Sequence, residues 1–261
     1  MCENSFNSPT RSSSILSSTY TQAARAAVLD FFSADASEYD VIFTANCTAA
    51  LRLVGESYPF TRETSRLVLP VDAHNSVNGL REFATSAGVP VQYVPMARYG
   101  DQSSALDVGR GLFVMTGQSN LSGLKPDLNL IGEAKRKGYD TLLDAAALSS
   151  TTPLSLRALG NGVDAMAISL YKMIGYPTGV GCLVARKAFL AKLRKQWFSG
   201  GTVVIVQVMQ LYLSAKFPSF TPFYQAPGNG RLLLDGHERW EDGTVNFLSL
   251  VSRECPERQD D

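Results

Sequence analysis

The chain has 261 residues, of which 45% are hydrophobic and 18% are charged, so it can build a sizeable core and its composition argues against global disorder. Basic and acidic residues balance at 24 each, which gives no sign of a nucleic-acid or membrane-surface partner. Four scattered cysteines and only two histidines argue against a metal site and favour a reducing, cytoplasmic setting.

The N-terminal region is serine-rich, and we expect residues 1–18 to be disordered or extended. No secretory signal is evident there, and the most apolar stretch, residues 202–213, is too short to cross a bilayer. Helical spacing of apolar residues begins over 19–34 and is followed by alternating strand and helix patterns. The expected strands are 40–44, 66–70, 90–94, 111–116, 141–144, 165–169 and 182–185, and the expected helices between them are 48–56, 77–87 and 128–137.

This alternation predicts an α/β fold with a mostly parallel seven-stranded sheet covered by helices on both faces. We expect one large domain over residues 19–251. Within it, residues 217–230 have the composition of a loop and residues 239–251 are expected to be ordered. Residues 252–261 form a polar tail. Ligands of such sheets bind beyond the carboxyl ends of the strands, so residues that follow strands are the first candidates for a site.

Lys172 and Asp144 each follow an apolar, strand-like run. Taken alone, such a lysine is more often a solvated surface residue, and such an aspartate is more often a turn former or helix cap. Together they have the chemistry that pyridoxal phosphate (PLP) needs. The lysine can hold the cofactor aldehyde as a Schiff base, and the carboxylate can keep the pyridine nitrogen protonated.

Three further strand ends carry polar candidates. Thr48 opens a helix whose N-terminus can favour a phosphate, although it can equally be a plain helix cap. His74 can stack on a flat cofactor or be a hydrogen-bonded loop histidine. Asn120 can donate to a ring oxygen or be an ordinary turn residue.

Taken together, the chain resembles the class V aminotransferase family of fold-type-I PLP enzymes, which includes the cysteine desulfurases. The likeness is greatest to the N-terminal, desulfurase-like domain of molybdenum cofactor sulfurases. The matching segments lie in family order: VIFTANCTAALRLVGE, DAHNSVNGLREFA, GQSNLSG, GYDTLLDAAAL, DAMAISLYKMIGYPTGVGCLVARK, WFSGGTV and HERWEDGTVNFLSL.

The resemblance implies a role for each candidate. Lys172 would be the Schiff-base lysine, Asp144 would pair with the pyridinium nitrogen, and His74 would stack on the ring. The remaining residues would surround the cofactor: Thr48, Ser169 and Tyr171 at the phosphate with Cys47 beside it, Asn120 at the ring oxygen, and Thr244 reaching the phosphate of the partner subunit in a homodimer.

The sequence departs from the family pattern in three ways. Ala147 stands where cysteine desulfurases commonly have glutamine, and the chain begins later than family members do. It also ends soon after the EDGT motif, so we expect the C-terminal small domain, with its substrate-carboxylate arginine and persulfide-forming cysteine, to be missing. None of the present cysteines is a good replacement: Cys182 is expected to be buried, Cys255 lies in the polar tail, and helix amides lowering the pKa of Cys47 would not bring it to the reacting side of the ring.

Three functions remain open from the residues. The first is a desulfurase-like, molybdenum cofactor sulfurase-like enzyme that takes sulfur from L-cysteine and passes it to an acceptor protein or cofactor. The second is another PLP reaction, by an aminotransferase, an epimerase or a C–S lyase. The third is an inactive, truncated chain.

Overall fold

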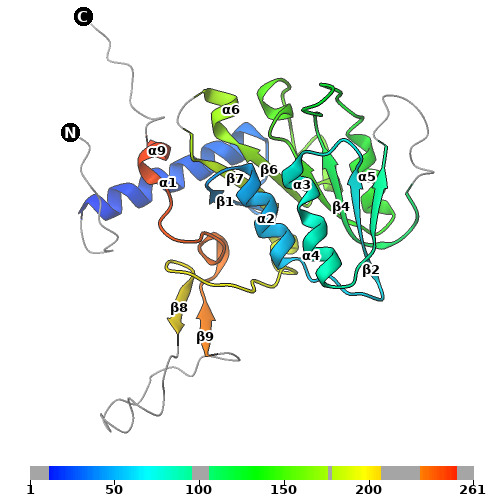
Figure 1. Cartoon of the computed structure of the whole chain (residues 1–261). Helices are drawn as coiled ribbons and strands as arrows, with labels where there is room; N and C mark the ends of the chain where they lie inside the picture. Colours follow the sequence, from blue (N-terminus) through cyan, green and yellow to red (C-terminus); the bar gives the residue numbers. More distant parts are fainter. Residues whose placement is uncertain (1–11, 96–105, 176–177, 207–229, 252–261) are drawn as a thin grey trace, which may run out of the picture. The chain divides into compact units, whose positions relative to one another are not determined.

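The computed structural model describes residues 12–95, 106–175, 178–206 and 230–251 (Figure 1). Contacts divide the chain into two compact units, one of residues 1–194 with 246–261 and one of residues 195–245. The candidate site lies wholly within the first unit.

A seven-stranded sheet forms the centre of the first unit, in the order β1-β7-β6-β5-β4-β2-β3. Its strands are β1 (Tyr39–Thr44), β2 (Ser65–Pro70), β3 (Val91–Val94), β4 (Arg110–Thr116), β5 (Asp140–Asp144), β6 (Ala165–Ser169) and β7 (Gly181–Arg186). Only β7 runs against its neighbours, and the pairs from β3 through β6 are parallel. The predicted mostly parallel, seven-stranded sheet is therefore confirmed, with each strand within about two residues of its expected bounds.

Helices cover both faces of this sheet (Figure 1). In the view of Figure 1, α2 and α4 lie in front of the strands and α1 and α5 lie behind them. Both faces of the central strands are therefore buried, which explains why β6 is apolar along its length rather than alternating. The helices of this unit are α1 (Ser12–Phe31), α2 (Cys47–Ser57), α3 (Asn75–Asn78), α4 (Leu80–Ser86), α5 (Asn129–Arg136), α6 (Leu170–Ile174), α7 (Lys187–Leu190) and α9 (Phe247–Val251).

Two helices differ from the sequence expectation. Helix α1 begins at Ser12, so the latter part of the segment expected to be disordered or extended is helical, while residues 1–11 lie outside the described residues. The single helix expected over 77–87 is split into α3 and α4. Asn78 and Gly79 are poor helix formers, and the Asn78 side chain donates to the Ala73 carbonyl rather than extending into solvent.

The second unit holds a small antiparallel pair, β8 (Val203–Val206) with β9 (Arg231–Leu233), followed by the short 3-10 helix η4 (Gly236–Arg239). Lys195 is buried here, and its ammonium donates to Asp242 over 2.7 Å. Of the loop expected over 217–230, only Gly230 falls among the described residues, and the polar tail 252–261 lies outside them. No helix in the described ranges is long and apolar enough to cross a membrane.

Candidate active site

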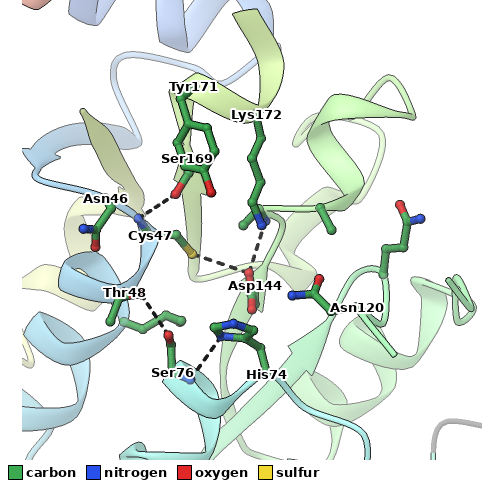
Figure 2. Close-up of a pocket in the computed structure, with 14 residues that line it drawn as sticks. Asn46, Cys47, Thr48, His74, Ser76, Asn120, Asp144, Ser169, Tyr171 and Lys172 are labelled. Atoms are coloured by element: carbon green, nitrogen blue, oxygen red, sulfur yellow. Dashed lines mark hydrogen bonds between the residues drawn. The ribbon is translucent and has the colours of Figure 1, made fainter. Parts of the chain in front are cut away.

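A cavity of about 210 Å³ opens where strands β5 and β6 end and helix α2 begins (Figure 2). Its walls come from the loops after β1, β2, β4, β5 and β6, which are far apart in the sequence. The lining residues are Asn46, Cys47, Thr48, Leu51, His74, Ser76, Gln118, Asn120, Asp144, Ala146, Ala147, Ser169, Tyr171 and Lys172. Of the candidates from the sequence, Cys47, Thr48, His74, Asn120, Asp144, Ser169, Tyr171 and Lys172 line this cavity, and Thr244 does not.

Asp144 and Lys172 face each other in this cavity (Figure 2). Asp144 is the last residue of β5 and is 7% exposed. Lys172 lies in the one-turn helix α6, directly after β6, and its side chain reaches toward the Asp144 carboxylate. Because β5 and β6 are adjacent and parallel, their carboxyl ends bring the two charges together.

The N-terminus of α2 forms a second wall, rich in hydrogen-bond donors. Asn46 is its N-cap and accepts from the Ala49 N–H over 2.9 Å. The Cys47 N–H donates to the Ser169 hydroxyl oxygen, also over 2.9 Å. The Thr48 hydroxyl lies 2.8 Å from the Ser76 hydroxyl and lines the cavity. Thr48 is thus not the cap of this helix, and its hydroxyl is placed to meet an anion.

Gly181 allows this wall to approach the sheet so closely. It pairs with Thr44 of β1 on one side and with Ser169 of β6 on the other. A Cβ atom at this position would lie 2.6 Å from the Asn46 carbonyl carbon and 2.6 Å from the Ile168 oxygen. A side chain there would push the start of α2 away from the end of β6, so glycine is required for the cavity to form.

His74 lines the cavity as the N-cap of α3. Its Nδ1 accepts a hydrogen bond from the Ser76 N–H over 3.1 Å, which leaves the proton of a neutral ring on Nε2. The interpretation as a hydrogen-bonded loop histidine is therefore confirmed, and it is compatible with a ring that also faces the cavity (Figure 2).

The loop after β4 brings Gln118 and Asn120 to the opposite rim. Ser119, between them, is buried, and its hydroxyl accepts from the N–H groups of Leu121 and Ser122. This turn is held in place from within and presents the exposed Asn120 amide to the cavity. Gln118 accepts from the Thr151 hydroxyl over 2.8 Å.

Cys47 differs from its expected chemistry. The residue is 6% exposed, and its thiol donates to Asp144 Oδ1 over 3.4 Å. Burial, followed by the negative charge of Asp144, raises the pKa of Cys47 far above its ordinary value, although Lys172 acts in the opposite direction. The pKa of Cys47 is therefore raised and not lowered, with desolvation as the largest cause, and the thiol keeps its proton.

The remaining cysteines and Thr244 lie elsewhere. Cys182 is fully buried in β7, as expected, whereas Cys2 and Cys255 lie outside the described residues. Thr244 belongs to the second unit and is not among the lining residues. Ser76 and Gln118 also line the cavity and were not predicted from the sequence, although each lies two residues from a predicted candidate.

Comparison with known proteins agrees with this geometry. The family model for class V aminotransferases matches residues 2–222. The chain belongs to the class V aminotransferase family. A curated relative, molybdenum cofactor sulfurase from Bos taurus, is 34% identical over 262 residues, which cover 92% of this chain and 28% of the relative. This class V chain therefore spans between a quarter and a third of that relative's length.

Two solved structures show the same fold. The apo cysteine desulfurase of Thermococcus onnurineus superimposes with a TM-score of 0.76 at 23% identity, covering 95% of this chain and 58% of that one. A variant of C-DES with glycine covalently linked to its PLP cofactor gives a TM-score of 0.72 at 18% identity, covering 94% and 61%. The class V chain thus has the large-domain fold of the fold-type-I enzymes, as its sequence predicted.

Proposed function

We propose that this chain binds PLP in the cavity at the ends of β5 and β6. The observation that carries the proposal is the meeting of Lys172 and Asp144 in one cavity with the hydroxyl groups at the start of α2. These three features match three of the polar groups of the cofactor, which are its aldehyde, its ring nitrogen and its phosphate.

The residues present fit this group. Asp144 is a nearly buried carboxylate with a cationic side chain directed at it, and Thr48 and Ser76 place two hydroxyl oxygens 2.8 Å apart at a helix N-terminus. The wall at Ala147 offers only a methyl group where the family commonly has glutamine, whereas Gln118 and Asn120 supply amides from the β4 loop. The Gln118 and Asn120 amides can therefore donate to the ring oxygen of the cofactor, although Ala147 cannot.

Each residue would then have a defined part. Lys172 would hold the cofactor covalently, Asp144 would keep the ring nitrogen protonated, and His74 would stack on the ring. Thr48, Ser169 and Tyr171 would hold the phosphate with Cys47 beside it, and Asn120 would reach the ring oxygen. Bound PLP supplies an electron sink for the bond broken in the substrate.

We further propose that the chain is the desulfurase-like part of a sulfur-transfer enzyme that acts on L-cysteine. The sulfurase and desulfurase relatives and the family membership support this substrate. In the overall reaction, L-cysteine and an acceptor thiol give L-alanine and an acceptor persulfide. The C–S bond of cysteine breaks, an S–S bond forms on the acceptor, and the thiol protons are retained in the products. The acceptor is a protein or cofactor thiol.

Binding of PLP is tested by visible absorption of the 261-residue chain after incubation with PLP and removal of the excess. We expect a visible band in the wild type, no such band in Lys172→Ala, and an unchanged band in Lys187→Ala. Lys187 is a suitable control because its ammonium donates to the exposed Ala36 carbonyl, away from the cavity. A wild-type chain without the band would contradict the proposal.

The reaction is tested by product analysis with L-cysteine and a small thiol acceptor. L-alanine with a persulfide supports sulfur transfer, whereas pyruvate with ammonia would identify a C–S lyase and D-cysteine would identify an epimerase. With a 2-oxo acid added as amino-group acceptor, a sulfur-containing 2-oxo acid formed from cysteine would identify an aminotransferase. A chain that binds PLP but forms none of these products would contradict an independent catalytic function and support the inactive alternative.

We also propose that the chain forms a cytoplasmic homodimer in which Thr244 of the partner subunit completes the phosphate site. The location is supported by the free thiols of Cys47 and Cys182 and is tested by cell fractionation. The shared site is tested by mixing Lys172→Ala and Thr244→Ala protomers. Mixed dimers regain one wild-type site, and hence the visible band with wild-type affinity, only if Thr244 acts across the interface. Failure of the mixture to gain such sites would contradict it.

A further inference from the structure

Asp144 is held by two donors on the same oxygen. Its Oδ1 accepts from the Ala146 N–H over 3.1 Å and from the Cys47 thiol over 3.4 Å. The Ala146 bond belongs to the turn that follows β5, whereas the Cys47 bond comes from the first residue of α2. The carboxylate is therefore fixed both from its own loop and from a distant helix.

The thiol can act only as a donor in this contact. Burial and the adjacent carboxylate raise the pKa of Cys47, so the sulfur carries its proton at neutral pH. An S–H group is a weak donor, but here both residues are more than nine-tenths buried, and a hydrogen bond is stronger in such surroundings than in water. The Cys47 backbone is fixed in turn, because its N–H donates to Ser169.

We infer that Cys47 is a positioning residue, whose S–H holds Asp144 Oδ1 so that Oδ2 is the oxygen presented to the cofactor ring nitrogen. The inference rests on the proposed binding of PLP and deepens it. With two donors on Oδ1, rotation of the carboxylate about its Cβ–Cγ bond would break both bonds. Cys47 thus acts through Asp144 and neither attacks the substrate nor carries sulfur.

The hydrogen bond itself is tested without cofactor, by the infrared S–H stretching band of the 261-residue chain. The band that disappears in Cys47→Ala belongs to Cys47. We expect Asp144→Ala to shift that band to higher wavenumber, because the thiol loses its acceptor. Asp140→Ala changes a carboxylate at the other end of the same strand and should leave the band in place. A Cys47 band that does not move in Asp144→Ala would overturn the inference.

The positioning role is tested by two measurements. The first is the affinity of the chain for PLP, and the second is the pH at which the visible absorption band of bound PLP is half of its full height. We expect Cys47→Ala to weaken PLP binding by roughly 2- to 10-fold, the effect of losing one neutral hydrogen bond, and to shift the midpoint. Cys47→Ser keeps a donor and should restore both values to near the wild type. Equal losses in the serine and alanine variants would show that Cys47 only fills space.

The two proposals fail differently. If the wild type binds no PLP, the proposed function is wrong whatever the infrared band does. If the wild type binds PLP but the Cys47 band does not respond to Asp144, the positioning role is wrong and the proposed function stands.

Discussion

Asp144 is the residue at which most of the candidate site converges. Its backbone oxygen accepts from the Gly117 N–H over 2.9 Å, which ties the β4 loop to the end of β5. Its side chain binds Cys47 and Ala146 and faces Lys172. Replacing Asp144 by asparagine separates the effect of its shape from the effect of its charge, because an asparagine can still accept on Oδ1 but carries no negative charge.

We therefore expect Asp144→Asn to lower turnover in the PLP-dependent reaction on the order of 10²-fold, since one group that stabilises developing charge is lost. The dissociation constant of PLP should rise much less, because the other contacts remain. Steady-state kinetics and a cofactor titration measure the two effects. Asp127→Asn, in an exposed loop, is the control, and full turnover in Asp144→Asn would show that this carboxylate does not serve the cofactor.

At the scale of elements, the site depends on how closely α2 packs against the end of the sheet. We expect Gly181→Ala to move the Asn46 backbone and to destabilise the fold by about 1–3 kcal/mol through overpacking. PLP binding should weaken with it, because Thr48 and Cys47 begin the same helix. Thermal unfolding and the visible band report the two effects. Gly200→Ala is the control, because a Cβ there meets no atom within 4 Å. If Gly181→Ala were as stable as Gly200→Ala and kept the visible band of bound PLP, this role of Gly181 would be wrong.

The sequence was sufficient for the elements whose signals are local. Buried parallel strands are short apolar runs bounded by turns, so β1 to β7 and the position of Asp144 and Lys172 at strand ends could be predicted. The protonation of Cys47 could not, because it follows from burial against Asp144, which is distant in the chain. The loops that carry Ser76 and Gln118 were identified through His74 and Asn120, but which further side chains of these loops face the cavity depends on the local turns.

At the scale of the whole molecule, an ionic cluster lies at the opposite ends of the strands that carry the site. Asp164, 5% exposed, precedes β6 and accepts from Lys135 over 2.5 Å and from the Thr141 N–H over 2.9 Å. Asp140 begins β5 and accepts from Lys192 and from the Tyr58 hydroxyl. The cluster joins α5, β5 and β6 far from the cavity, so it serves stability and not the cofactor.

We expect Asp164→Ala to cost about 2–3 kcal/mol of the free energy of unfolding, because a buried carboxylate that satisfies several donors is lost. This loss of unfolding free energy is smaller than that expected for a fully buried ion pair, since the Lys135 side chain is 32% exposed. Asp107→Ala removes an exposed partner of Arg66 and should change stability by less than about 0.5 kcal/mol. Chemical denaturation measures both, and PLP absorption of the folded variants should match the wild type. Equal stability of the two variants would contradict the assignment.

The position of β1 in the sheet has a consequence for the order in which the chain folds. Tyr39–Thr44 pairs with Gly181–Arg186 and not with the strand that follows it in the sequence. During synthesis, the first strand leaves the ribosome long before its neighbour exists, and its hydrogen-bonding edge stays open meanwhile. Closing so long a loop is slow. We therefore expect β1, and with it the start of α2 and the cavity beside it, to be secured only after β7 has formed.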